Sequence, residues 1–184
     1  WDTNFRLRVG NKGVGILNVT NGGRITTETD GVVGWLATGN GTVTVDGVSS
    51  SWEIDGEFQV GDRADGVVTI SGGALISNVG NGSIGKRKGS SGVVTVGGSG
   101  STWTNAADLS IAGSDIADGG NATGSLQVNS GGTVNVGGSL RVWTGGALNL
   151  SGGLVNAAAL LNQGGTMSFG SGTMNVTSTG SNLG

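Results

Sequence analysis

The sequence predicts an all-β protein, and within that class a parallel β-helix. Residues 1–51 and 52–102 align without a gap, and such a fixed long period means that one unit stacks on copies of itself. Short runs rich in Val, Ile and Thr alternate apolar and polar residues, as half-buried strands do. Glycine fills 41 positions and proline none, which suits tight corners between strands that must all donate their N–H groups.

Each 51-residue unit contains six predicted strands. Those of the first unit lie at 7–9, 16–20, 24–26, 32–34, 42–45 and in a segment ending at Trp52. Those of the second lie at 58–60, 67–71, 75–77, 83–85, 93–96 and in a segment ending at Trp103. Six strands can form antiparallel hairpins or two triangular coils of about 25 residues, each coil advancing about 4.8 Å. The gapless repeat favours coils, with Val43, Val45, Val94 and Val96 stacked in the core.

A third, degenerate repeat begins at Trp103 and gains seven residues within a loop at 113–124. The 51-residue register is lost after Val134. The region 137–184 reads as shorter coils, with strands at 139–142, 147–150, 154–156, 160–162, 166–169 and 173–176. Residues 1–184 therefore form one predicted domain of about seven coils, a rod roughly 30–35 Å long at the strand spacing.

Composition excludes several classes of function. The net charge is −3, only 11% of residues are charged, and no basic stripe or membrane-spanning apolar stretch occurs. We interpret the basic run 86–88 as a solvated turn. Because His and Cys are absent, a Ser-His-Asp triad, a thiol nucleophile and the usual zinc sites are excluded. The chain opens on the repeat residue Trp1 with no signal peptide, which indicates a mature protein or a piece cut at a repeat boundary.

The order of motifs resembles a known bacterial repeat. Residues 92–103 read Gly-Val-Val-Thr-Val-Gly-Gly-Ser-Gly-Ser-Thr-Trp, 109–111 read Leu-Ser-Ile, and 124–134 read Gly-Ser-Leu-Gln-Val-Asn-Ser-Gly-Gly-Thr-Val. This is similar to the repeat of autotransporter passenger domains and PEP-CTERM-type surface proteins, over residues 1 to about 136. The resemblance implies a right-handed parallel β-helix, secretion and a place at the surface or in the matrix of a Gram-negative bacterium. It implies no activity and carries over no functional residues.

The main enzymatic alternative is acid chemistry of the kind used by pectin-type lyases and tailspike glycosidases, which are β-helical. Glu53, Asp55 and Glu57 alternate after Trp52, so on one strand they would share a face and could form a carboxylate pair or a calcium site. The aligned positions in the other repeats are polar without being consistently acidic. We therefore interpret this row mainly as a solvated edge.

Two further features give candidate site residues. The loop at 113–124 carries Asp115 and Asp118, which we take as candidate calcium ligands because loops leaving a scaffold often carry function. Trp1, Trp52 and Trp103 recur with the repeat and are expected to fill a wide corner against the core. Trp35 and Trp143 break the repeat and are the candidates for exposed ligand contacts.

The sequence thus predicts a non-enzymatic structural or adhesive module, secreted or on the bacterial cell surface, with no cofactor. Because no helix is available to cap an end coil, the expected partners are other copies of the chain or neighbouring repeats. Surface glycans are a further expected class of ligand. End-to-end stacking into a filament is one expectation. A fragment of a carbohydrate-active β-helix enzyme or a phage tailspike is the alternative. The sequence does not favour ice binding, because Thr42 and Thr44 are matched by Val93 and Thr95, which breaks a Thr-x-Thr ladder.

Overall fold

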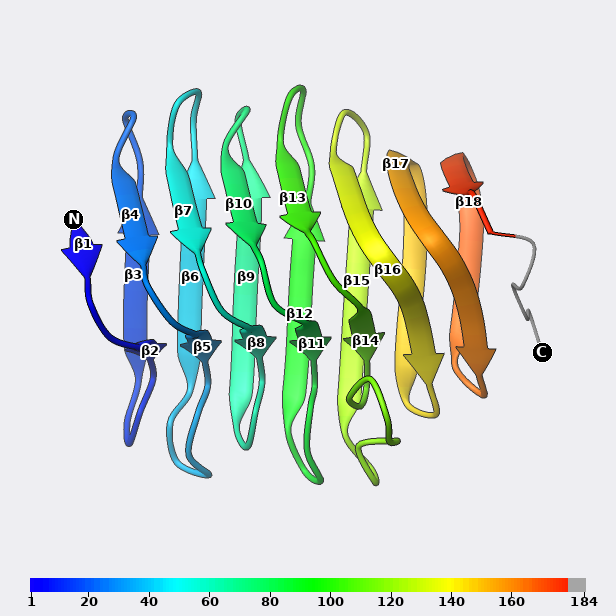
Figure 1. The fold of residues 1–184 in the computed structure, drawn as a ribbon, viewed down its shortest axis with the longest axis horizontal. Helices are drawn as coiled ribbons and strands as arrows, with labels where there is room; N and C mark the ends of the chain where they lie inside the picture. The colour runs from blue at the N-terminus through cyan, green and yellow to red at the C-terminus, as the bar shows by residue number, and fades with distance from the viewer. Residues whose placement is uncertain (179–184) are drawn as a thin grey trace.

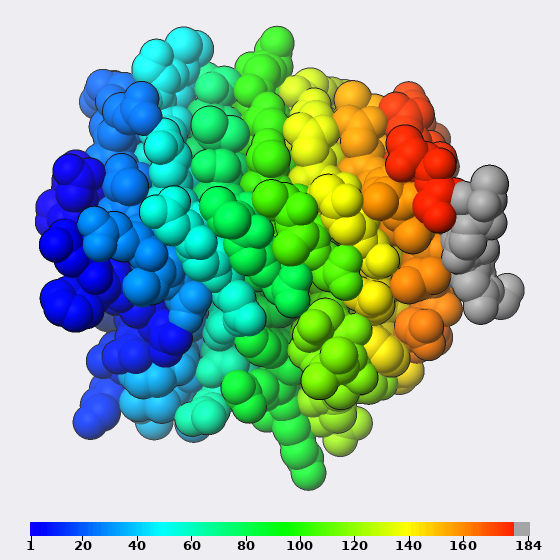
Figure 2. Space-filling view, in the orientation of Figure 1, coloured from blue at the N-terminus to red at the C-terminus, as the bar shows by residue number. Residues whose placement is uncertain are grey.

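The computed structural model describes residues 1–178, which form a right-handed parallel β-helix of seven coils (Figure 1). The chain advances along the rod one coil at a time, so the colours follow one another in bands across its surface (Figure 2). All pairings between the strands are parallel, and the antiparallel contacts of the described part are two isolated bridges, Gly113–Asp118 and Trp143–Gly164. The described residues contain no helix that could cross a membrane.

The strands line three faces, which we call A, B and C. Face A holds β1 (Asp2–Thr3), β4 (Arg24–Thr27), β7 (Ser51–Ile54), β10 (Leu75–Asn78) and β13 (Thr102–Asn105). Face B holds β2 (Leu7–Val9), β5 (Gly31–Val33), β8 (Phe58–Val60), β11 (Gly82–Ile84) and β14 (Leu109–Ile111). Face C holds β3 (Gly15–Val19), β6 (Gly41–Asp46), β9 (Asp65–Ser71), β12 (Ser91–Val96) and β15 (Thr123–Asn129).

Towards the C-terminal end the strands run around corners without a break. β16 (Thr133–Trp143) supplies faces A and B, β17 (Gly146–Gln163) supplies all three, and β18 (Thr166–Val176) supplies C and A. The coils also change in length. Successive coils hold 27, 24, 27, 31, 21 and 19 residues, measured between the paired positions Arg24, Ser51, Leu75, Thr102, Thr133, Leu154 and Thr173. Two coils therefore make one 51-residue unit, the inserted loop lengthens one coil, and the rod then tapers.

Large and small core residues alternate from coil to coil, which gives the period its physical reason. On face A the inward position passes from Ile25 to Trp52, then to Ile76 and Trp103. On face B a glycine stacks on either side of Phe58. A Cβ at one of these, Gly31, would lie 2.9 Å from the Trp52 ring and 3.2 Å from that of Phe58. The bulky side chains of one coil thus occupy space that the neighbouring coils leave open.

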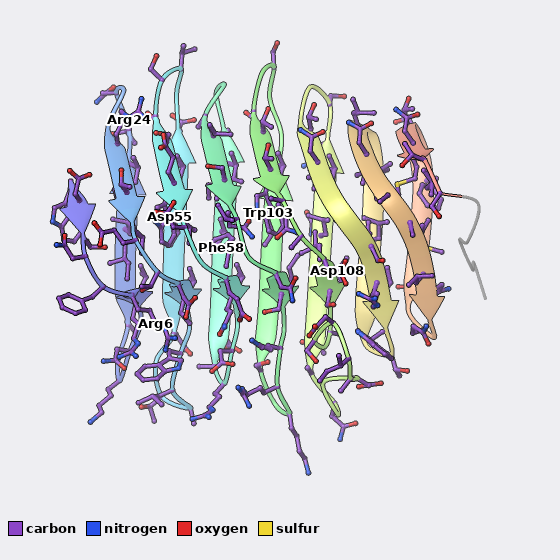
Figure 3. All side chains as sticks on the ribbon, in the orientation of Figure 1. Arg6, Arg24, Asp55, Phe58, Trp103 and Asp108 are labelled. Carbon is purple, nitrogen blue, oxygen red and sulfur yellow. The ribbon has the colours of Figure 1, made fainter. Side chains whose placement is uncertain are left out.

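Trp52 and Trp103 lie in the core, as the sequence predicts, and Figure 3 labels Trp103 beside Phe58. The same prediction is wrong for Trp1, which is exposed because it lies on the outermost strand-bearing coil of face A. Phe58 meets the ring of Trp52 at 5.2 Å and that of Trp103 at 5.8 Å, both edge to face, a favourable geometry for aromatic pairs. Each indole N–H also finds an acceptor one coil earlier, at 2.9 Å: Thr27 Oγ1 for Trp52 and Asn78 Oδ1 for Trp103. Burial of these indoles therefore leaves no donor unsatisfied.

The predicted valine ladders are confirmed. Val43, Val45, Val94 and Val96 are fully buried and belong to one continuous core. Their neighbours in register are Val68 and Ile70 of the intervening coil.

One corner position between faces B and C requires a left-handed backbone. It is glycine in the first four coils, with φ between 68° and 77°. At Gly61 a Cβ would lie 2.4 Å from the Ser91 carbonyl oxygen of the next coil. The fifth coil has Ala112 there, at φ 63°, and its Cβ lies 3.9 Å from the Cβ position of Gly145. The alanine is therefore accommodated at this coil, where the inserted loop begins, because the residue that faces it in the next coil is Gly145.

Candidate functional site on face B

Face B is the most enclosed outer surface of the rod. Its strands have three residues, and their middle side chains form one column: Arg8, Val32, Gln59, Ser83 and Ser110. Three of these, Val32, Ser83 and Ser110, are only 1%, 5% and 1% exposed, although they are not part of the core cluster. Side chains from the two flanking corners therefore cover this face. We call this column and its two corners the face B groove.

The corner between faces A and B carries a ladder of side-chain acceptors. Asp30 Oδ1 accepts a hydrogen bond from the Glu57 amide at 3.0 Å, and Asn81 Oδ1 accepts one from the Asp108 amide at 3.2 Å. Asp108 Oδ1 in turn accepts one from the Ser139 amide at 2.7 Å. These side chains join each coil to the next. Sequence analysis missed them because their partners lie about one coil away along the chain.

Ion pairs also connect neighbouring coils. Five of the six within the described residues do so, and they are Arg6–Asp30, Arg24–Glu53, Lys86–Glu57, Arg87–Asp62 and Arg141–Asp108. In the basic run 86–88, Lys86 Nζ lies 2.9 Å from Glu57 Oε2, and Arg87 Nε lies 2.8 Å from Asp62 Oδ1. Two of its three cations are therefore coil-to-coil contacts rather than a solvated turn.

The acidic row does not lie on one strand, so the expectation that alternation places the three carboxylates on one face is wrong. β7 ends at Ile54, and Asp55 and Glu57 lie in the corner before β8. Glu53 points outward on face A and pairs with Arg24, whereas Glu57 accepts from Lys86 over face B. Figure 3 shows Asp55 at this corner, where it is exposed. The turn separates the carboxylates that simple alternation would bring together.

Asp108 has the best-defined electrostatic environment of the groove. Burial alone would raise the pKa of its carboxyl. The hydrogen bond from Arg141 at 2.5 Å and that from the Ser139 amide outweigh this effect, so the pKa is lowered. The carboxylate is thus held in its charged form by the following coil.

Trp35, a predicted ligand-contact residue, is half-buried at the corner between faces B and C. The guanidinium carbon of Arg8 lies 3.3 Å from its ring centroid, a cation–π contact with the preceding coil. Burial, reinforced by the nearby charge of Arg6, lowers the pKa of Arg8. One face of the Trp35 ring is therefore occupied by the protein itself. Ligand binding there stays a prediction.

Trp143, the second predicted contact residue, is half-buried against the inserted loop. Its Nε1 donates to the Ser114 carbonyl oxygen at 2.8 Å, and a Cβ at Gly113 would lie 2.6 Å from its ring. The loop leaves the rod as a small hairpin closed by the Gly113–Asp118 bridge, visible as the yellow-green knob at the lower front of Figure 2. Trp143 thus holds the loop to the scaffold.

The two predicted calcium ligands lie on this hairpin. Asp118 is exposed, and its Oδ1 accepts from the Gly120 amide at 2.7 Å. Asp115 is half-buried, and with Lys86 it lines a cavity of about 10 Å³, the size of one water molecule. The hydroxyl of Ser83 faces the same cavity and has no hydrogen-bond partner. A larger, open hollow of about 470 Å³ separates the hairpin from residues 86–88.

Within residues 1–178 no group of three or more Asp, Glu, His or Cys side chains is placed to hold a metal ion. Calcium binding at Asp115 and Asp118 therefore stays a prediction that rests on two carboxylates. Searches against protein-family models, curated proteins and solved structures find no match. The function is thus inferred from the geometry and from the sequence.

Proposed function

We propose that this protein is a non-enzymatic β-helical scaffold, secreted or displayed on a bacterial cell surface, that keeps other segments or molecules at a fixed spacing. The observation that carries the proposal is the use of its charged groups. Glu53, Glu57, Asp62 and Asp108 each bind a cation of a neighbouring coil. These carboxylates stabilise the stack, whereas glycosidic acid chemistry requires two carboxyl groups that flank the bond to be cleaved.

The N-terminal edge supports the further proposal that another coil covers it. β1, β2 and β3 each pair with one neighbour. Trp1 and Phe5 there are 69% and 80% exposed, and Val14 is as exposed as Phe5. Edge strands and apolar surface of this kind favour addition of strands from a partner. Another copy or neighbouring repeats would supply that coil, and the contracted C-terminal coils would make a copy-to-copy junction unequal in size.

A turnover screen tests the enzymatic alternative. The protein is incubated with pectin, alginate and chitin oligomers, and product formation is followed over time. The scaffold proposal predicts no saturable turnover. Turnover that disappears on replacing Glu57, with the fold intact by circular dichroism, would overturn it.

A second experiment addresses the edge. Light scattering over a wide concentration range compares the parent with a Phe5→Glu, Val14→Glu variant, which places charge on the exposed edge without touching the core. We expect the mass of the parent to rise further with concentration than the mass of the variant, which has lost the apolar edge. Equal masses for both proteins at every concentration would contradict a role for this edge.

A further inference from the structure

Face C differs from the other two faces in charge. β3, β6, β9, β12 and β15 pair without a register shift, so their outward side chains form two straight columns. The first column is Ile16, Thr42, Val67, Val93, Ser125, Ala147 and Thr166. The second is Asn18, Thr44, Thr69, Thr95, Gln127, Asn149 and Ser168.

No residue of these two columns is charged, whereas face A carries Arg24 and Glu53 and face B carries Arg8 and Arg141. All six ion pairs among the described residues use groups from faces A and B and from the corners. The acids of face C, Asp46 and Asp65, lie at the two ends of its strands. The centre of face C can therefore be removed from water without desolvating a charge, the main cost at a buried interface.

We infer that face C is a lateral interface with a second copy of this chain, joined face to face by a two-fold axis. Sheets pack in this way about 10 Å apart, with their strands aligned to within about 30°. Seven coils at about 4.8 Å and six residues at about 3.3 Å give a face of about 34 by 20 Å. Two such faces bury roughly 1,400 Å² in total, within the range of about 1,200–2,000 Å² for specific interfaces.

The side chains of face C suit this partner. Val67 is 38% exposed and Ile16 68% exposed, so the first column presents apolar surface that the second copy would cover. Thr, Val, Ser and Ala lose little rotamer freedom when they are packed. The second column supplies hydroxyl and amide groups that pair across the interface, and the Asp46 and Asp65 ends form a polar rim. This interface is independent of the proposed stacking at the N-terminal edge.

The test compares the parent with a Val67→Lys, Gln127→Lys variant, which places two charges at the centre of face C two strands apart. A Thr26→Lys, Ser77→Lys variant is the matched control, because it adds the same charges on face A, also two strands apart. Circular dichroism and the thermal midpoint show whether each variant is folded. Light scattering gives the mass, and small-angle X-ray scattering gives the cross-section of the rod.

We expect the parent and the face A variant to reach at least twice 17.9 kDa with a thicker cross-section, and the folded face C variant to keep the cross-section of a single rod. A parent that stays monomeric at high concentration, or a face A variant that dissociates equally, would overturn the inference. A parent that lengthens at constant cross-section, in a manner abolished by Phe5→Glu, would assign the association to the ends. A monomeric parent that alters ice growth would assign face C to ice.

Discussion

Phe58→Ala is the sharpest perturbation of the alternating core. The ring is fully buried and meets Trp52 and Trp103 edge to face, so its removal leaves a cavity beside both indoles. A buried Phe→Ala change costs about 3–5 kcal/mol, and the two lost aromatic contacts place this one at the upper end. For a domain of this size that corresponds to a midpoint lowered by roughly 8–20 °C. Phe5→Ala is the matched control, because Phe5 is 80% exposed and its loss costs less than about 0.5 kcal/mol.

The assay is urea unfolding followed by tryptophan fluorescence, which reports on the indoles that contact Phe58. A second substitution tests the alternation itself. Gly31→Ala alone costs about 1–3 kcal/mol through overpacking, since its Cβ would lie 2.9 Å from the Trp52 ring and 3.2 Å from the Phe58 ring. In the Phe58→Ala background the same change has more room, and a coupling of about 0.5–3 kcal/mol is expected. Strict additivity, or a Phe58→Ala midpoint no lower than that of Phe5→Ala, would refute the alternating-core explanation of the period.

Three further predictions concern the corner, the acid range and the core. Gly61→Ala should lower the free energy of unfolding by at least about 2 kcal/mol, because the new Cβ meets the Ser91 carbonyl at a positive φ. Ala112→Gly, at the equivalent corner, should stay within about 1 kcal/mol of the parent. Equal urea midpoints for the two variants would contradict this prediction. Because the pKa of Asp108 is lowered in the folded state, its ionised carboxylate stabilises the fold above the unfolded-state pKa, and this effect is lost as the pH falls through the folded-state pKa. The parent should therefore lose more stability than Asp108→Asn between about pH 5 and pH 2. Parallel curves of urea midpoint against pH for the two proteins would count against this prediction. Val94→Asp buries an unpaired charge and should cost about 3 kcal/mol or more, which a thermal midpoint within a degree or two of the parent would disprove.

The sequence predicted the architecture because stacking repeats the same environment at a fixed interval. Positions that pair in register, such as Val43, Val68 and Val94, face the same core. Alternation and period together therefore locate the buried face. The burial of Trp52 and Trp103 followed from their repeat position alone. The two-coil period was visible, but its cause was not, because the fit of Gly31 against Phe58 is a contact between coils.

The candidate site was harder to predict because its determinants lie one coil apart. In the sequence Glu57 belongs to an acidic row. In the fold, the turn after Ile54 places Glu57 beside Lys86 of the next coil. Trp35 and Trp143 stood out as breaks in the repeat, yet what covers them is set by Arg8 and by the inserted loop. Such pairings require the register, which local pattern does not supply.

Disulfide trapping of the coil register tests the central claim, the stacking of coils in a parallel β-helix, most directly. Because the protein has no native cysteine, only the introduced pair can form a disulfide. Ser77 pairs with Thr104 across face A, and Thr102 lies two residues earlier on the same strand and the same side. The paired Cα atoms are about 4.8 Å apart and the displaced ones about 8 Å, on either side of the roughly 7 Å limit for a disulfide. The β-helix predicts that Ser77→Cys, Thr104→Cys closes on mild oxidation while Ser77→Cys, Thr102→Cys stays reduced, as read by mass spectrometry. Equal oxidation of both pairs, or preferential closure of the displaced pair, would contradict it.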